Sequence, residues 1–328
     1  MNPFINPVFN PVFSRYPLRL VDVGAAGVLR SPWPRASTFL HVYAFEPGAR
    51  VEDILQGQNQ NITVFPVALS DHSGRAMLHE TKKPDGSSLL QPSNNLEPYG
   101  GSDRFEVVKE YPVEVETLDQ IIAQHAIPYV DFLKIDTQGT ELQVLKGSEG
   151  TLVSVFGIHL EVNFFGRYEG QTYFSDVDSW LRHRGFVLYD LERRYLKLKT
   201  GLNFGGPKGA LMKGDALYLR NPLIPDIYND ADPESRKARA LRKIAIALLY
   251  GYVDVAFGLF QEFNLFFCDE EIVVLRDFFS HTKSSARFIP QFRGRVRLAR
   301  FFKQIGAWLE PRSNIGSSGD DIFGNSLR

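Results

Sequence analysis

The sequence predicts an α/β fold, in which a sheet of mainly parallel strands is covered by helices on both faces. Short β-like runs alternate with helix-compatible stretches from residue 18 to about residue 220, which is typical of parallel strands joined by crossover connections. Several of these runs are apolar throughout, as strands buried on both faces must be. With 44% hydrophobic and 23% charged residues, the composition of the 328-residue chain excludes a disordered or collagen-like protein.

Seven runs are predicted to be the strands of this sheet. They cover residues 18–23, 41–45, 63–68, 132–135, 158–162, 186–189 and 216–219. Between the third and fourth runs lies a polar segment, 83–95, which is rich in turn formers and flanked by β-like residues 76–79 and 112–115. A connection of this length is uncommon unless it is functional, so we interpret it as a lid; the alternative is a surface insertion.

The α/β domain is predicted to occupy residues 18–222, preceded by an arm at 1–17. Residues 1–16 contain three prolines and no lysine or arginine before Arg15. They lack the basic start and apolar core of a secretion signal, and we expect an extended arm that docks Phe9 and Phe13 on a surface.

A mainly helical region, 223–312, is predicted to follow the α/β domain. From Pro233 onward Lys, Arg, Ala and Leu favour helix. The apolar run 244–260 is expected to be one buried helix, because it is shorter than a membrane span and carries Asp254. The Gly- and Ser-rich residues 313–328 are expected to form a flexible tail.

One stretch of the helical region, 291–305, is both basic and amphipathic. Seven Lys and Arg residues occur from Lys283 to Lys303 with no acidic residue among them. Apolar residues fall on another face of the same predicted helix: Leu298, Phe301, Phe302 and Ile305. The favoured interpretation is a solvated cap on the main domain, and the alternative is contact with an anionic membrane or a protein partner.

Net charge and cysteine content restrict partners and compartment. The chain has 37 Lys and Arg against 38 Asp and Glu, which provides no global field for nucleic acid, so no nucleic-acid partner is predicted. The single cysteine, Cys268, cannot form an intramolecular disulfide, which favours a reducing cytoplasm.

The first predicted strand ends in a turn of small residues that is suited to a cofactor. Gly24 leaves the backbone open to a ligand, and Glu46 follows the second strand about 20 residues later, where a carboxylate can accept both ribose hydroxyls of an adenosine group. Ala25 and Ala26 interrupt the glycine spacing that a pyrophosphate needs, and Asp22 suits an amino-bearing ligand. These residues favour S-adenosylmethionine over NAD.

Five motifs then point to a known family. In order, they are VDVGAAG at 21–27, YAFEP at 43–47, VALSD at 67–71, TLD at 117–119 and FLKIDTQGTE at 132–141. In order and spacing they resemble the FkbM-like family of S-adenosylmethionine-dependent methyltransferases. The resemblance covers about residues 18–191 and implies a class I methyltransferase fold, a Rossmann-like sheet of seven strands with the last strand antiparallel.

The resemblance also implies cofactor-binding roles for six residues. Asp22, Gly24 and Ala25 would line the methionine end, Glu46 would hold the ribose, and Ser70 with Asp71 would lie beside the adenine. The alternative for residues 71–74 is a plain turn.

Two carboxylates are the main catalytic candidates. In the implied strand order Asp136 and Glu161 end neighbouring strands beside the methyl donor, and either could take the proton of an acceptor hydroxyl, with His159 in reserve. Lys134 shares a strand face with Asp136 and needs an acidic partner, for which either carboxylate could serve. No metal site is predicted, since no clear third carboxylate joins the pair.

The predicted function is transfer of a methyl group from S-adenosylmethionine to a hydroxyl of a sugar, glycan or related natural product, with general-base assistance. The aromatic segment 163–171 is suited to stacking on sugar faces, or else packs beneath its own loop. The alternatives are a noncatalytic binding module on a degenerate methyltransferase fold and an NAD-dependent oxidoreductase.

Overall fold

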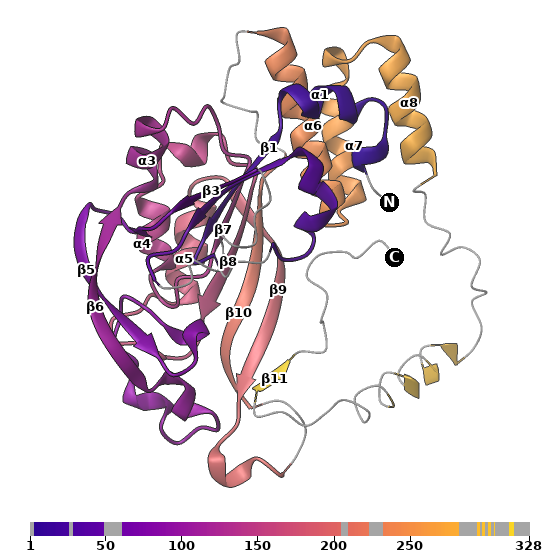
Figure 1. Cartoon of the computed structure of the whole chain (residues 1–328). Coiled ribbons are helices and arrows are strands. Elements are labelled where there is room, and N and C mark those ends of the chain that lie inside the picture. Colours follow the sequence, from indigo (N-terminus) through magenta and orange to yellow (C-terminus); the bar gives the residue numbers. More distant parts are fainter. Residues whose placement is uncertain are drawn as a thin grey trace.

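The main sheet of the protein has β1 at its centre, flanked by β2 and β7 (Figure 1). The computed structural model describes residues 3–25, 29–48, 61–204, 209–222, 232–281, 294–295, 297–298, 301–302, 305 and 315–317. The sheet order is β11-β9-β10-β8-β7-β1-β2-β3. Its strands are β1 (Leu18–Val23), β2 (Leu40–Phe45), β3 (Ile62–Phe65), β7 (Phe132–Ile135), β8 (Gly157–Asn163), β9 (Phe186–Leu196), β10 (Ala210–Arg220) and β11 (Ile315–Ser317).

The strand directions confirm the predicted fold class. Strands β3, β2, β1, β7 and β8 are mutually parallel neighbours, whereas β10 pairs antiparallel with both β8 and β9. Without β11 this is a seven-stranded sheet whose last strand in sequence is the antiparallel one. Parallel order places the carboxyl ends of β1, β2, β7 and β8 along one edge, where ligands of open α/β sheets bind.

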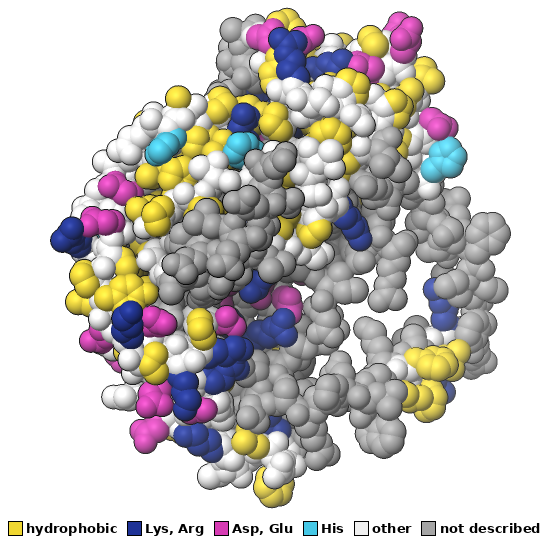
Figure 2. Space-filling model, in the orientation of Figure 1, with side chains coloured by type: hydrophobic (Ala, Val, Ile, Leu, Met, Phe, Trp, Pro, Cys, Tyr) yellow, Lys and Arg dark blue, Asp and Glu magenta, His cyan; other side chains and the backbone are white. Residues whose placement is uncertain are grey.

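One predicted strand, 63–68, is divided between two sheets. The chain leaves the main sheet after Phe65, and β4 (Ala68–Leu69) joins β5 (Gly74–Thr81) and β6 (Val107–Glu116) in a second sheet of order β4-β6-β5. Pro66 lies at the break and lacks the N–H that a continuous ladder requires. Figure 2 shows acidic and basic side chains interspersed over this part of the surface, where Arg75 pairs with Glu114.

Helices cover both faces of the main sheet, as predicted. On one face lie α3 (Leu118–Gln124), α4 (Glu141–Lys146) and α5 (Phe174–Arg182), packed against the apolar residues of the central strands. On the other face lie α1 (Phe9–Arg15), α6 (Pro233–Leu249), α7 (Val253–Glu262) and α8 (Asp269–Ser280). Short 3₁₀ turns connect these elements: η1 (Pro3–Ile5), η2 (Trp33–Phe39), η3 (Pro84–Gly86), η4 (Asn94–Leu96), η5 (Ser102–Phe105), η6 (Thr151–Val153), η7 (Lys199–Gly201) and η8 (Asn264–Phe266).

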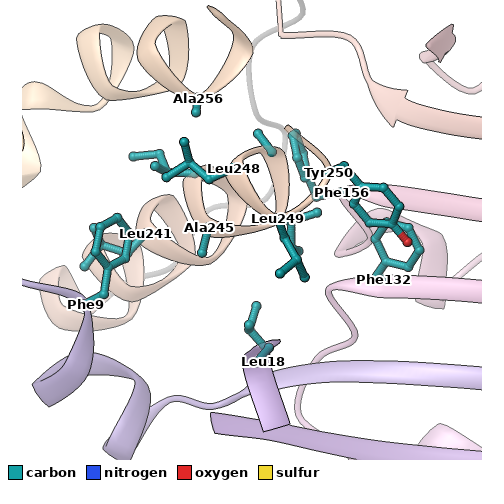
Figure 3. Close-up of a cluster of buried hydrophobic side chains, with 14 of the residues drawn as sticks. Phe9, Leu18, Phe132, Phe156, Leu241, Ala245, Leu248, Leu249, Tyr250 and Ala256 are labelled. Atoms are coloured by element: carbon teal, nitrogen blue, oxygen red, sulfur yellow. The ribbon is translucent and has the colours of Figure 1, made fainter. Parts of the chain in front are cut away.

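Helix α6 is the main cover of that second face, so the C-terminal helices complete the sheet domain. Asp232 caps its N-terminus by accepting from the backbone N–H groups of Glu234 and Ser235. Figure 3 shows Leu249 facing Leu18, and Tyr250, just after the helix, stacks on Phe132 with ring centroids 5.2 Å apart. The run 244–260 is two helices and not one, because the chain turns after Leu249, with Gly251 at a φ of 80°.

The N-terminal arm is helical, contrary to the prediction of an extended arm. Phe9 and Phe13 are buried, 0% and 1% exposed, and come one above the other on α1. Pro11 lies in the first turn of α1, where the missing N–H costs no helical hydrogen bond. The expected docking of the two phenylalanines is therefore correct.

Part of the predicted flexible tail forms the edge strand β11. Residues 315–317 pair antiparallel with β9, whose outer backbone groups would otherwise be unpaired. The basic segment 291–305 lies largely outside the described residues; four of its described apolar side chains are exposed: Leu298, Phe301, Phe302 and Ile305. Membrane or partner contact there stays a prediction. Among the described helices, none is both long and apolar enough to cross a bilayer.

Candidate active site

A cavity of about 190 Å³ opens at the carboxyl ends of β1, β2 and β7. Apolar side chains from β2, β4, β5 and the residues beside them form part of its wall: Phe45, Pro47, Val67, Leu69 and Leu78. Polar side chains contributed by β10 and by the chain that follows β7 form another part: Asp136, Thr137, Gln138, Thr140 and Lys213. An apolar wall joined to a few convergent polar groups is the usual form of a small-molecule site.

Gly24 begins the turn after β1 and lines the cavity. Its φ of 72° is in the left-handed region, and a Cβ built on it would lie 2.1 Å from the backbone oxygen of Asp136. Its N–H donates to the oxygen of Phe45 at 3.0 Å. The position therefore requires glycine both for its conformation and for the close approach of the two strand ends.

Asp22 and Ala25, the other two residues predicted at the methionine end, do not line the cavity. Asp22 accepts the Lys134 ammonium at 2.8 Å, and Lys134 also donates to the Gly24 oxygen at 3.0 Å. The expected partner of Lys134 was Asp136 or Glu161, and this prediction is wrong. Lys134 pairs with Asp22 of β1, because the two residues lie opposite each other in the strand register. Ala25 is buried in the apolar cluster beneath the C-terminal helices.

Glu46 lies in the cavity wall, as a ribose-binding residue must. It is 7% exposed, and one of its oxygens accepts from the Gly48 N–H at 3.0 Å. Ser70 and Asp71 follow β4 but do not line the cavity; their neighbours Ala68 and Leu69 do. The hydrogen bond from His72 keeps the pKa of Asp71 low. An adenine contact for this pair stays a prediction.

Asp136 follows β7 directly and lines the cavity. Burial alone would raise the pKa of Asp136, but Lys134, Lys213 and a hydrogen bond from Gln138 outweigh it and hold the pKa below its usual value. The bond from Gln138 Nε2 to Asp136 Oδ1 is 2.5 Å long. The carboxylate is therefore ionised at neutral pH.

Glu161, the second catalytic candidate, is placed next to Asp136 but is fully engaged. It is 1% exposed and pairs with both Arg167 and Lys213, and Gln138 Nε2 donates to its Oε2 at 3.2 Å. It does not line the cavity. Both oxygens of Glu161 are therefore occupied by donors of the protein itself, and neither is open to an acceptor hydroxyl in the cavity.

His159 shares the strand face of Glu161 but lies one pleat further from the sheet edge. Its Nε2 is 3.9 Å from Asp215 Oδ1, and it does not line the cavity. Burial would raise the pKa of Asp215, yet the bond from His159 and the charge of Lys213 lower it to about 2. Within the described part of the chain, no group of three or more His, Cys, Asp or Glu side chains could hold a metal ion.

Comparison with known proteins fits this geometry. Residues 35–188 match the model of the methyltransferase FkbM domain. These residues form an FkbM methyltransferase domain. A 2-O-methyltransferase, NoeI of Sinorhizobium fredii, is 32% identical over 142 residues, which cover 40% of this chain and 56% of that protein. The chain thus spans little more than half the length of this curated relative.

Two solved structures show a distant likeness to the chain that contains the FkbM domain. Precorrin-6y C5,15-methyltransferase of Geobacter metallireducens is 12% identical, with 64% of this chain and 87% of that chain covered and a TM-score of 0.32. The C-terminal domain of the Rhodobacter capsulatus precorrin-6Y enzyme is 15% identical, with 62% and 81% covered and a TM-score of 0.29.

Several residues of the site were not found by sequence reasoning. Gln138 and Lys213 line the cavity, and Arg167 and Tyr168, which are 1% and 2% exposed, hydrogen-bond to Gln138. Because Arg167 and Tyr168 are buried, they cannot stack on a sugar, and the packing alternative for the segment is correct at these two positions. A buried arginine needs an anionic partner, and Glu161 lies only six residues before Arg167. This requirement could have predicted their pairing.

The predicted lid is built into the wall of the cavity. Ser87, Ser88 and Leu89 line it, and the Ser88 hydroxyl donates to the backbone oxygen of Gln138 at 2.9 Å. The Tyr168 hydroxyl donates to the Gly86 oxygen at 2.8 Å. These bonds join the segment between β5 and β6 to the chain after β7 and to the chain after β8, so the segment forms a fixed side of the site.

Proposed function

We propose that the protein transfers a methyl group from S-adenosylmethionine to a hydroxyl oxygen of a sugar or glycan. The observation that carries the proposal is the cavity at the carboxyl ends of the parallel strands, which places Gly24 beside Glu46 and Asp136 of the FkbM methyltransferase domain. The sugar hydroxyl is inferred from the relative NoeI, which is named a 2-O-methyltransferase.

The residues of the cavity fit this cofactor. Glu46 would accept the ribose hydroxyls, and the apolar side chains beside it, Phe45 and Leu69 among them, would enclose the adenine. Gly24 has no Cβ where the methionine end would pass, and a side chain there would collide with the Asp136 backbone. Bound S-adenosylmethionine supplies an activated methyl group on its sulfonium.

Asp136 is the proposed general base. Of the three catalytic candidates it alone lines the cavity, whereas Glu161 is held by three donors and His159 lies beside Asp215. With the methyl donor bound, Asp136 would accept the proton of the acceptor hydroxyl as that oxygen takes the methyl group from the sulfonium. Such assistance contributes roughly 10²- to 10⁴-fold to a rate.

Calorimetric titration with S-adenosylmethionine, S-adenosylhomocysteine and NAD tests the cofactor. We expect the two adenosyl ligands to bind and NAD not to, and Glu46→Gln to weaken binding about tenfold or more, since one ribose contact is lost. Glu149→Gln, an exposed glutamate beside Arg184, is the control. Binding of NAD alone would indicate an oxidoreductase, and binding of none would indicate a noncatalytic module.

Transfer of a radiolabelled methyl group to a panel of mono- and oligosaccharides tests the acceptor. Label in a sugar product, and none in matched deoxysugars that lack one hydroxyl, would identify the methylated position. Label that accumulates only on proteins or nucleic acids would refute the proposed acceptor class.

A further inference from the structure

Gln138 has a backbone conformation that is uncommon for its residue type. Its φ is 58°, in the left-handed region, and Gly139 follows it at 116°. A side chain at positive φ is strained, and such residues persist only where the surrounding contacts determine them. The strained residue lies in the loop after β7 that lines the cavity. The contacts of the Gln138 side chain therefore indicate which groups this loop positions.

The side chain of Gln138 bridges the two carboxylates of the site. Its Nε2 donates to Asp136 Oδ1 at 2.5 Å and to Glu161 Oε2 at 3.2 Å. The residue is 6% exposed, and both N–H groups of the amide are used. One oxygen of Asp136 is thereby fixed, and the carboxylate is held in a single orientation at the cavity wall.

The amide of Gln138 can take only one orientation. Its Oε1 accepts from Arg167 Nη1 at 2.9 Å and, at 3.2 Å, shares the Tyr168 hydroxyl proton with the Gly86 oxygen. Since a guanidinium only donates, the oxygen of the amide must face Arg167 and its nitrogen must face Asp136. Arg167 is in turn paired with Glu161 and donates from Nε to Asn163 Oδ1 at 3.0 Å.

We propose that Gln138 is a positioning residue, which holds the general base Asp136 ionised and directed at the acceptor hydroxyl, and that Arg167 with Tyr168 fixes its amide for this purpose. The inference rests on the proposed role of Asp136. It also gives a function to the loop in which Gln138 adopts a positive φ. If the Gln138 amide were rotated, its oxygen would face the Asp136 carboxylate and repel its charge.

Other charged groups also act on Asp136, and they determine what a change at Gln138 can do. Lys134 from its own strand and Lys213 from β10 favour the ionised form, and Asp215 from β10 opposes it. Asp22 and Glu161 pair with these two lysines. Loss of the Gln138 donor leaves all of these charges in place, so the pKa of Asp136 should rise without the carboxylate becoming neutral at pH 7.

The test is a pH titration of the Asp136 carboxyl carbon by NMR in protein with ¹³C-labelled aspartate. The signal is assigned by its loss in Asp136→Asn. In Gln138→Leu the pKa of Asp136 is expected to rise by about one unit or more. The acid limb of turnover should move to higher pH by the same amount, since the base must be ionised to accept a proton.

The matched control is Gln143→Leu, five residues along the chain. Gln143 is half-buried, and its Oε1 has no hydrogen-bond partner among the described residues. It does not line the cavity, so the titration of Asp136 should be unchanged. If Gln138→Leu does not fold, Gln138→Met replaces it, since an unbranched side chain of similar length also removes the donor.

The outcomes separate this inference from the proposed function. Turnover lowered equally at all pH values, with an unmoved Asp136 titration, would mean that Gln138 only supports the loop, and the inference would be wrong. A moved titration in a protein that binds neither adenosyl ligand would leave the coupling intact and would refute the methyltransferase proposal instead.

Discussion

The two halves of one sheet face differ sharply, although the same strands build both. At the amino ends of the parallel strands the face is apolar: Leu18 and Leu20 on β1 and Phe132 on β7 pack beneath the C-terminal helices. At the carboxyl ends it is charged, and Asp22 pairs with Lys134 where the two strands run side by side. Along β7 the change occurs within one pleat.

The apolar half of the sheet face therefore serves stability, and the charged half serves the chemistry of the cavity. The apolar half is covered by helices and stabilises the fold by burying apolar surface. In the charged half each ion needs a partner, and Asp136 lines the cavity. Substitutions in the two halves should therefore be read by different measurements. Phe132 and Asp136 are the clearest pair, since they lie on the same face of one short segment.

The largest expected effect is on stability, at the apolar half. Phe132 is fully buried, stacks on Tyr250 and meets Trp33 edge-on at 5.0 Å. Phe132→Ala removes this ring from the layer beneath α6, so the free energy of unfolding should fall by about 3–5 kcal/mol. Denaturant unfolding measures it. Affinity for S-adenosylmethionine at low temperature should be nearly unchanged; a selective loss of affinity would contradict the separation of the two halves.

The next effect is on turnover, at the charged half. Asp136→Asn keeps the size of the side chain but cannot accept the hydroxyl proton, so turnover should fall about 100-fold. Steady-state kinetics with the sugar acceptor measure the change. Unchanged turnover would remove Asp136 from the mechanism.

A third substitution tests the contact between the strand ends. Gly24 and Gly170 have nearly the same φ, 72° and 70°, but a Cβ on Gly24 would lie 2.1 Å from a backbone oxygen, whereas one on Gly170 would meet nothing within 4 Å. Gly170→Ala therefore reports backbone strain alone. Gly24→Ala should lower affinity for S-adenosylmethionine at least about tenfold more than this control does. Equal affinities would show that the close approach does not shape the cofactor site.

The fold was largely predictable because apolar strand runs are local signals. Residues 18–23 and 132–135 were predicted with the observed bounds, and the motif order implied the antiparallel last strand. The division at Pro66 could have been predicted from the residue itself. The helical arm at Phe9 and Phe13 does not follow from the sequence pattern, because proline usually interrupts a helix, whereas Pro11 lies in the first turn of α1, where it costs no hydrogen bond.

The site was predictable at single residues but not as a network. Gly24, Glu46 and Asp136 follow strand ends and line the cavity. Gln138 and Lys213 come from segments far apart in sequence. Their place in the site depends on side-chain contacts with Glu161, which the spacing of residues in the sequence does not predict. The pairing of Lys134 with Asp22 likewise follows from strand register, which a sequence alone does not give.

The smallest expected effect concerns a buried acid near the charged half. Glu141 is 1% exposed, and burial together with the charge of Glu161 raises its pKa to about 7 from a usual 4.5. Between these values the unfolded chain releases a proton that the folded protein keeps, so stability from this group falls as pH rises from about 5 to 7. Glu141→Gln cannot ionise, so its free energy of unfolding relative to that of the wild type should rise by more than about 1 kcal/mol between pH 5 and 7.

Denaturant unfolding at pH 5, 6, 7 and 8 measures the difference, with the exposed Glu149→Gln as control. Parallel curves for the wild type and Glu141→Gln would show that Glu141 is ionised in the folded protein, and its hydrogen bonds from the Gly139 N–H would then outweigh its burial.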